Sequence, residues 1–240
     1  VYDGAPTVIT SFMATIVKAA GFIAFIRLFQ GCFASLQGQW QLIAAIIAAS
    51  TLVIGNVTAL FQQSVKRMLA YSSISQAGFM MFAIVSLNSM AVEGLLYYAL
   101  AYCMATIGAF AILARMNDYT FDGYNGMGKH HPFLAATNVV FMLSLAGIPA
   151  TAGFMGKFYM LSAAINNGQV FWLVVLGVVC AAISVYYYFR VIQAMYFKDG
   201  SRQEIEAGSG FKILLAVLSA AIILLGIFPQ SLIDLLYYFF

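Results

Sequence analysis

Long apolar runs separated by short polar connections dominate the pattern of this chain. Seven runs approach or exceed the length of about 20 helical residues that crosses roughly 30 Å of bilayer hydrocarbon. They predict seven membrane-spanning helices, at residues 7–29, 39–61, 67–87, 91–114, 132–162, 169–197 and 211–228. The connections at 115–131 and 198–210 are polar loops, and the final stretch, 229–240, is typical of an interfacial tail.

The fifth run is too long for one straight helix, and its middle carries helix-breaking residues. Its 31 residues would extend about 46 Å as a helix, well beyond the bilayer core. Pro149 removes a backbone donor, and Gly147 and Gly153 flank it. We expect a helix that ends near residue 146 and resumes near Gly153. Broken helices of this kind mark ion or substrate sites in transporters, although a simple proline kink has the same sequence pattern.

Composition supports an all-α, polytopic membrane protein with about seven transmembrane helices, one of them broken. The chain has 240 residues, 63% of them hydrophobic and 8% charged, and its mean hydropathy is +0.94. Soluble domains carry about 25% charged residues, so the bilayer is the surrounding that this composition fits. We expect residues 1–240 to form a single transmembrane helical domain. The net charge of +3 gives no indication of a nucleic-acid partner.

Motifs for metals, nucleotides and redox centres are missing from the sequence. Cys32, Cys103 and Cys180 lie far apart in apolar runs, without the paired spacing of an iron–sulfur or zinc site. The segment "GFMGKF" has Phe158 where a phosphate-binding loop requires Ser or Thr after the lysine. The sequence therefore predicts no metal and no cofactor site in this chain.

Basic residues are distributed unevenly between the two ends of the predicted bundle. Seven spans place Arg27 on one side and the remaining loop-associated basic residues on the other: Lys66, Arg67, Arg115, Lys129, Lys198, Arg202 and Lys212. By the positive-inside rule, the N-terminal end of the chain is expected on the cytoplasmic or matrix side, with the C-terminus opposite. Tyrosines gather near span ends, as at 186–190, which fits an aromatic belt and core packing equally well.

Two lysines lie within predicted spans. Lys18 is near the middle of span 7–29, which shows no interruption, and Lys157 follows the break at Pro149. A charged lysine at the bilayer centre costs about 2.5–3.5 kcal/mol on insertion scales, so such residues are by default candidates for function. We predict that both are proton-relay residues. The alternative is a structural lysine paired with a carboxylate or a helix C-terminus.

Weaker candidates lie in and beside the span 67–87. Ser72, Ser73 and Gln76 could hydrogen-bond between helices or hold water along a proton path. Lys66 is expected near the cytoplasmic surface, where anchoring explains it well. Ser11 and Thr15 share a helical face with Lys18, which predicts that the Lys18 side chain faces the protein interior.

Three segments carry a family resemblance: "VYDGAPT" at 1–7 followed by Lys18, "VKRMLAYSSISQAGF" at 65–79, and "LAGIPATAGFMGKFY" at 145–159. Together they resemble the antiporter-like membrane subunits of respiratory complex I, most of all the branch called subunit N in bacteria. The sister subunits and the Mrp cation/proton antiporters share the second and third segments in looser form. The resemblance covers essentially the whole chain.

The resemblance implies a fold of fourteen transmembrane helices built as two inverted five-helix repeats, of which this chain matches helices 8 to 14. It places Lys18 on the central polar axis and Lys157 at the terminal lysine of a half-channel. Many relatives have a second proline where this chain has Ala150, which is expected to soften the break without removing it. The family's glutamate on helix 5 and lysine on helix 7 would lie upstream of Val1, in the same or a separate chain.

The resemblance also implies a function: a proton-translocating membrane-arm subunit of NADH–quinone oxidoreductase, in the bacterial or mitochondrial inner membrane. NAD, FMN, iron–sulfur clusters and quinone are then expected in other subunits. The expected partners are other membrane-arm subunits and the missing N-terminal half. Two alternatives stay open: an Mrp-type cation/proton antiporter subunit that uses the same lysines, and a non-pumping structural half-subunit.

Overall fold

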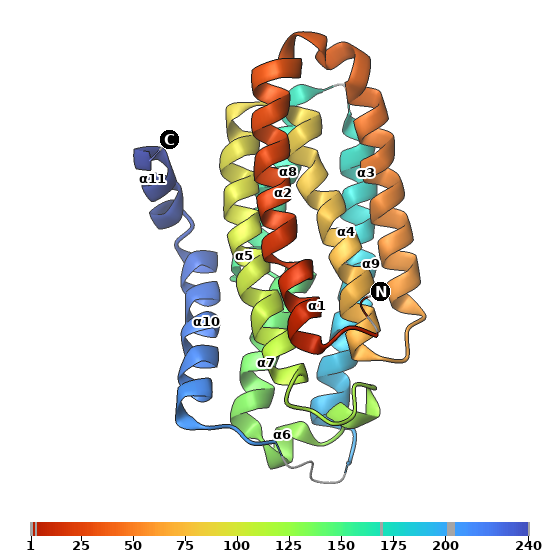
Figure 1. The fold of residues 1–240 in the computed structure, drawn as a ribbon, viewed down its shortest axis with the longest axis vertical. Helices are drawn as coiled ribbons and strands as arrows, with labels where there is room; N and C mark the ends of the chain where they lie inside the picture. Colours follow the sequence, from red (N-terminus) through yellow and green to blue (C-terminus); the bar gives the residue numbers. More distant parts are fainter. Residues whose placement is uncertain (1, 3, 169, 201–204, 240) are drawn as a thin grey trace.

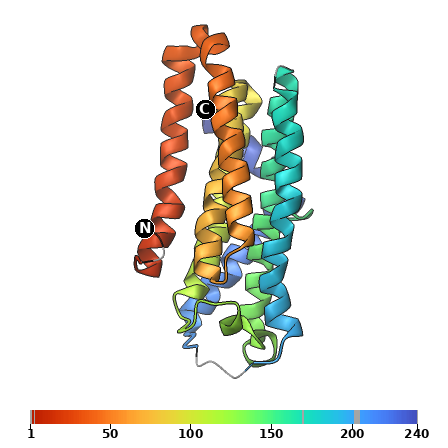
Figure 2. The same ribbon diagram turned by 90° about the vertical axis from the view of Figure 1, so that its right-hand side faces the viewer.

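Long helices that run along one common axis make up the protein (Figures 1 and 2). The computed structural model describes residues 2, 4–168, 170–200 and 205–239. Within these residues the only strand-like pairing is an isolated bridge between Ser64 and Thr120. The predicted all-α class is therefore confirmed, and the helices, in chain order, are α1 (Thr7–Ala14), α2 (Ile16–Leu28), α3 (Gln37–Leu60), α4 (Val65–Ser86), α5 (Ser89–Leu113), α6 (Met127–His130), α7 (Pro132–Ala146), α8 (Ala152–Asn167), α9 (Phe171–Phe197), α10 (Ser209–Ile227) and α11 (Gln230–Phe239).

Five helical stretches in the described part of the chain are long and apolar enough to cross a membrane. The first, Thr7–Leu60, reverses direction through a π turn at Phe29–Phe33 and a 3-10 turn at Ala34–Leu36 (Figure 2). Its two arms correspond to the predicted spans 7–29 and 39–61. The other four stretches are α4, α5, α9 and α10, which lie within two residues of their predicted spans.

The predicted span 132–162 is divided into two helices, α7 and α8. Residues 147–151 between them are not helical. The break falls where the sequence predicted it, since α7 ends at Ala146 and α8 begins at Ala152, one residue before Gly153.

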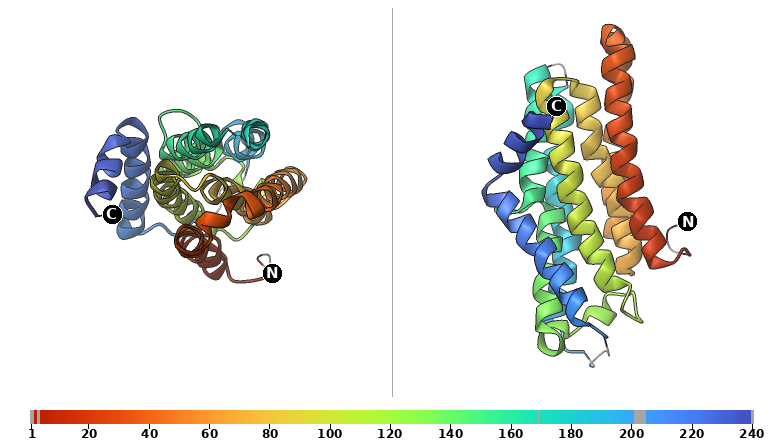
Figure 3. Two further views of the ribbon diagram at one scale, coloured as in Figure 1. Left: turned by 90° about the horizontal axis from the view of Figure 1, so that it is seen from above. Right: turned by 60° about the vertical axis from the view of Figure 1, so that its left-hand side comes forward.

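Helix α4 is the central element of the bundle, and most of its residues are buried. It packs against α3 most extensively, and also against α5, α8, α9 and the α1–α2 arm. Close contact with α3 depends on two glycines, because a Cβ on Gly55 would lie 2.5 Å from the Ser75 backbone nitrogen and one on Gly78 would lie 2.8 Å from the Leu52 side chain. The polar stretch 71–78 is thereby held in the middle of the molecule. Helix α10, in contrast, runs along the edge (Figure 3).

The two polar loops meet at one end of the bundle, the lower end in Figure 1. Arg190 of α9 donates to the Gln62 carbonyl at 3.0 Å, and its guanidinium carbon lies 3.9 Å from the centre of the Phe121 ring. Lys129 pairs with Asp199 across the loops. This pairing holds the pKa of the Asp199 carboxyl below its usual value, through the hydrogen bond and the charge of Lys129. Arg202 lies outside the described residues.

Candidate functional site

The break between α7 and α8 begins at Gly147, which has the left-handed φ of +81°. Its N–H donates to the Leu143 and Ser144 carbonyls, and the Ile148 N–H donates to the Leu143 carbonyl at 3.0 Å. This is the Schellman pattern, in which a glycine ends a helix and a proline commonly follows one or two residues later. The helix ends where the sequence predicted, near residue 146. The residue that ends it is Gly147, whereas the sequence interpretation gave the main role to Pro149, which lies two residues beyond the cap.

Ala150 is the second unusual backbone position in the break. Its φ is +67°, a conformation that L-residues other than glycine rarely adopt. A proline ring fixes φ near −65°, so a proline could not take this backbone conformation at position 150. The backbone at Ala150 is therefore one that a second proline would not allow.

The helix end at Gly147 leaves two carbonyl oxygens without helical partners, and Lys157 binds both. Its Nζ donates to the Leu145 oxygen at 2.9 Å and to the Ala146 oxygen at 3.0 Å. A cation at a helix C-terminus is favoured by the helix dipole as well as by these bonds. A Cβ on Gly147 would lie 2.9 Å from the Lys157 Cδ, so the glycine also leaves room for the lysine side chain.

Gly153 lets α8 approach the last turn of α7. A Cβ at this position would overlap the Ser144 carbonyl, and the Gly153 N–H donates to the Ser144 hydroxyl at 3.1 Å. The Ser144 hydroxyl therefore satisfies one of the free N–H groups at the start of α8. This contact fixes how α8, and with it Lys157, sits against the end of α7.

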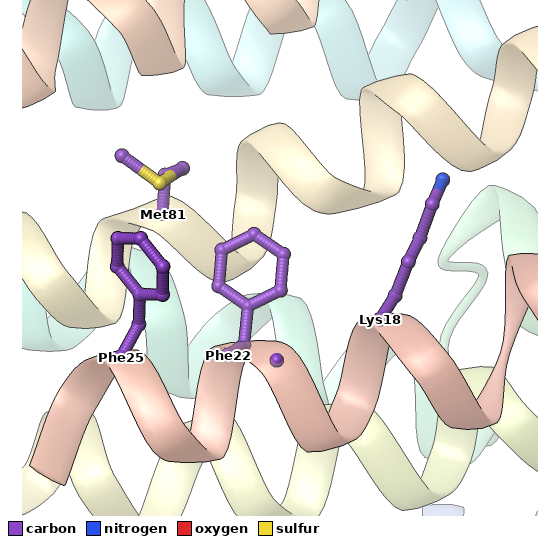
Figure 4. Close-up of a pocket in the computed structure, with 5 residues that line it drawn as sticks. Lys18, Phe22, Phe25 and Met81 are labelled. Atoms are coloured by element: carbon purple, nitrogen blue, oxygen red, sulfur yellow. The ribbon is translucent and has the colours of Figure 1, made fainter.

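Lys18 points from α2 toward α4, as Figure 4 shows. Its Nζ donates to both the carbonyl and the hydroxyl oxygen of Ser73, each at 2.7 Å. The amine thus faces the protein interior and polar groups, as the helical periodicity predicted. The wall beyond it is apolar: Phe22, Phe25 and Met81 line, with Lys18 and Gly21, a cavity of about 240 Å³.

The helix that carries Lys18 is interrupted, which the sequence analysis did not predict. Thr15 separates α1 from α2 with φ −110° and ψ −81°. The Ala14 carbonyl beside this interruption accepts a hydrogen bond from the Tyr102 hydroxyl at 2.8 Å. The expectation of an uninterrupted span 7–29 is therefore wrong, and Lys18 lies one turn beyond a local break.

Polar side chains of α4 connect the neighbourhoods of the two lysines. Ser73 holds Lys18, and Gln76, one turn along the same helix, donates through Nε2 to the Leu145 carbonyl that also binds Lys157. The same Gln76 nitrogen donates to the Tyr188 hydroxyl at 3.0 Å, and Tyr188 in turn contacts the Ser72 hydroxyl. Helix α4 therefore binds the Lys18 amine directly, through Ser73, and shares the Leu145 carbonyl with the Lys157 amine, through Gln76.

Three tyrosines of this network were missed at the level of sequence. The Tyr98 hydroxyl donates to Gln76 Oε1, and Tyr187 donates to the Asn56 side chain at 3.0 Å. Tyr187 and Tyr188 are fully buried, whereas Tyr186 is 64% exposed. Of the three consecutive tyrosines 186–188, two therefore pack in the core and one faces outward, because successive residues of a helix point about 100° apart. Their polar tips can reach partners only where another helix supplies them.

Lys66 differs from the expected surface anchor. Its side chain is buried, with 4% of its area exposed. The Nζ donates to the Ala5 carbonyl at 2.7 Å and lies 5.3 Å from the centre of the Tyr119 ring. It lies at the loop end of the bundle, where it joins the N-terminal segment to the loop after α5 instead of reaching solvent.

The site offers amines, hydroxyls, an amide and main-chain carbonyls. Among the described residues, no carboxylate oxygen lies within 4 Å of the Lys18 or Lys157 amine. The same residues contain no group of three or more His, Cys, Asp or Glu side chains that could hold a metal ion. Such an arrangement can hold a proton on either amine and stabilise it with neutral oxygen atoms.

Comparison with known proteins agrees with the three segments that carry the resemblance. Residues 1–184 match the family described as NADH:quinone oxidoreductase/Mrp antiporter, transmembrane. NADH-quinone oxidoreductase subunit N of Desulforamulus reducens is 42% identical over 98% of this chain. A chain of respiratory complex I from Thermus thermophilus is 32% identical over 97% of this chain, with a TM-score of 0.85.

A second solved structure shares the fold alone. A chain of the Mrp complex from Dietzia sp. superposes with a TM-score of 0.87 at 17% identity, over 98% of this chain. This chain spans about half the length of the relatives it matches: 50% of the Desulforamulus protein and 52% of the Thermus chain.

Proposed function

We propose a function from one premise: the chain belongs to the NADH:quinone oxidoreductase/Mrp antiporter family of membrane proteins. In our proposal it forms half of a proton-translocating subunit in the membrane arm of an NADH–quinone oxidoreductase. Lys157 exchanges its proton with one aqueous side, and Lys18 relays protons between half-channels. The relatives named subunit N support this assignment.

The single observation that carries the proposal is how the two amines are bound. Lys157 is 5% exposed, and its described partners are two carbonyl oxygens and an aromatic ring. Among the described residues, the hydrogen bonds of the Lys18 amine go to Ser73. A lysine with a structural role in a membrane pairs with a carboxylate or with backbone carbonyls such as those of a helix C-terminus. Lys157 has the helix C-terminus and no carboxylate among the described residues. Neutral partners leave each amine free to lose its proton without stranding a buried negative charge.

The bonds at each amine have the strength that such a function needs. Moving one charge against 100 mV costs about 2.3 kcal/mol. A hydrogen bond to a charged group contributes about 1.5–3 kcal/mol. Making or breaking one of the Lys157–carbonyl bonds therefore changes the free energy by as much as the transfer requires.

The distribution of basic residues supports an orientation for the chain. Lys129 lies in the loop end of the bundle and Lys66 contacts its loop, whereas Arg27 lies near the opposite end. We propose that the loop end faces the cytoplasm or matrix, by the positive-inside rule, and that the C-terminal helix α11 lies toward the other side.

We further propose that the redox chemistry takes place elsewhere. NAD, FMN, iron–sulfur clusters and quinone belong to other subunits of the complex in this proposal, and this chain supplies proton-carrying groups only. Its partners are other membrane-arm subunits, the lipid bilayer, and an upstream half, in the same or another chain, that completes the proton path.

Substitution of Lys157 tests the proposal in the assembled complex. In inverted membrane vesicles, Lys157→Met is expected to reduce proton uptake per quinone reduced at least severalfold, because methionine fills similar space but carries no proton. Lys157→Arg is also expected to impair pumping, since arginine does not release its proton. Lys129→Met, an exposed loop lysine, serves as the matched control and is expected to pump normally.

The outcome also separates the alternative functions. Normal pumping by an assembled Lys157→Met complex contradicts the relay and favours a scaffolding half-subunit. The family's description, which also names the Mrp antiporters, favours a second candidate, cation/proton exchange without electron transfer. That candidate is favoured if the chain exchanges Na⁺ or K⁺ for protons and purifies without NADH-oxidising subunits.

A further inference from the structure

The Lys157 ammonium has three N–H groups, but its two carbonyl partners account for only two of them. The third partner is the ring of Phe79 on α4: the Lys157 nitrogen lies 5.0 Å from the ring centre. A cation within about 6 Å of a ring centre, over its face, is attracted by the negative charge density of that face. Phe79 is therefore part of the surroundings that the amine senses.

The Phe79 ring is held in place by other aromatic side chains. Phe82 stacks on it with the ring centres 6.1 Å apart, and Tyr98 meets it edge-on at 6.3 Å. Phe79 is 1% exposed. These contacts hold the ring in one orientation, so that it presents the same face to Lys157. The attraction between a ring face and a cation is strongest in a buried site such as this one.

The other charged and titratable groups on the helices around α8 are bound to other partners or lie toward the ends of their helices. Helix α5 contributes three tyrosines whose hydroxyls donate elsewhere: Tyr98 to Gln76, Tyr97 to the Leu225 carbonyl and Tyr102 to the Ala14 carbonyl. Glu93 lies near the start of α5, and α4 carries Lys66 and Arg67 in its first turn, at the loop end. Helix α9 contributes Tyr188, bound to Gln76 and Ser72. No residue of α7 titrates, and α10 carries Lys212 in its first turn, at the loop end.

We propose that Phe79 is a positioning residue that stabilises the ammonium form of Lys157 over its neutral amine. The neutral amine keeps two hydrogens for the Leu145 and Ala146 carbonyls, so those bonds distinguish the two forms only weakly. Its lone pair then faces the ring, where electron density repels electron density. The ring face thus separates the two protonation states, and it sets how readily Lys157 gives up its proton. This inference rests on the proposed function of Lys157.

Graded fluorination of the Phe79 ring is the sharpest test, because it withdraws charge from the ring face while nearly preserving its shape. Fluorinated phenylalanines are introduced at position 79 in the whole complex, and proton pumping per quinone reduced is measured against pH in vesicles. The alkaline limb, where pumping falls as Lys157 loses its proton, is expected to move stepwise to lower pH. Full fluorination is expected to move it by roughly one pH unit.

Two ordinary substitutions and one control accompany this series. Phe79→Met removes the ring and is expected to move the alkaline limb in the same direction. Phe79→Tyr keeps the ring and is expected to keep the wild-type profile. Phe110→Met removes an equally buried ring of α5 that lies beside α1, and it is expected to leave the profile in place. A merely structural role for Phe79 would lower the amount of assembled complex without moving the profile.

An unchanged profile across the fluorinated series overturns the inference, as does a shift of equal size in Phe110→Met. The result is distinguishable from a failure of the proposed function. If Lys157→Met pumps normally, the proposed function itself is wrong. If Lys157→Met stops pumping while the fluorinated variants keep the wild-type profile, only the role of Phe79 is wrong.

Discussion

The backbone conformation at the end of α7 places the two carbonyl oxygens that bind Lys157. Gly147 takes a left-handed φ of +81°, which ends α7 and leaves the Leu145 and Ala146 oxygens to the lysine. Ala150 takes a left-handed φ of +67° without the freedom of glycine. This conformation costs an L-residue about 1–2 kcal/mol. The break therefore carries a small strain that one substitution can remove.

Ala150→Gly is expected to stabilise the protein slightly. Relief of about 1–2 kcal/mol of backbone strain outweighs the added freedom of the unfolded chain, about 0.4–1 kcal/mol, for a net gain of about 0.5 kcal/mol. Thermal unfolding of the purified complex in detergent measures this as a small rise in the midpoint. Ala146→Gly, the same change within helical backbone at the end of α7, is the control and is expected to lower the midpoint. A lower midpoint for Ala150→Gly contradicts the left-handed conformation.

At the scale of helices, apolar runs predicted the spans well, because burial in hydrocarbon fixes both their length and their composition. The break in the fifth span was predictable for a similar reason, since glycine and proline act locally. The interruption at Thr15 was not, because a threonine inside an apolar run carries no such signal and takes its conformation from contacts such as the Tyr102 bond to Ala14.

The candidate site was predictable to the same extent. Lys18 and Lys157 were found because charge in a membrane span is rare, and Ser73 and Gln76 because polar groups gather there. Tyr98 and Tyr188 were not found, since an amphipathic tyrosine suits a membrane interface as well as a core. Only the packing of α5 and α9 around α4 shows that their hydroxyls meet Gln76. The burial of Lys66 likewise depends on a loop that folds under the bundle.

At the scale of the whole molecule, the two ends of the bundle differ. The loops that carry Lys129 and Asp199 lie at one end, and the turn at Phe29–Phe33 lies at the other (Figure 1). Cys32 is exposed within that turn, so the chain already contains a reporter for one end. An engineered cysteine in the loop 115–131 supplies the reporter for the other.

Labelling from the two sides of the membrane is expected to separate these reporters. With Cys103 and Cys180 replaced by serine, an impermeant thiol reagent should modify Cys32 only from the periplasmic or intermembrane side. Asp118→Cys, combined with Cys32→Ser, should react only from the cytoplasmic or matrix side. Labelling after permeabilisation controls for access in both variants. Reaction of both cysteines from the same side contradicts the antiparallel arrangement of spans, and an exchange of sides contradicts the proposed direction.

We propose that Lys18 and Lys157 act on one proton path joined through α4. The most direct measurement is the number of protons moved per quinone reduced in Lys18→Ala, in Lys157→Met and in the double variant, all in assembled complex. Groups that act as a unit give strongly non-additive losses. We predict that each single variant loses as many protons as the double variant. Losses that add, or a single variant that keeps the wild-type ratio, would contradict a shared path.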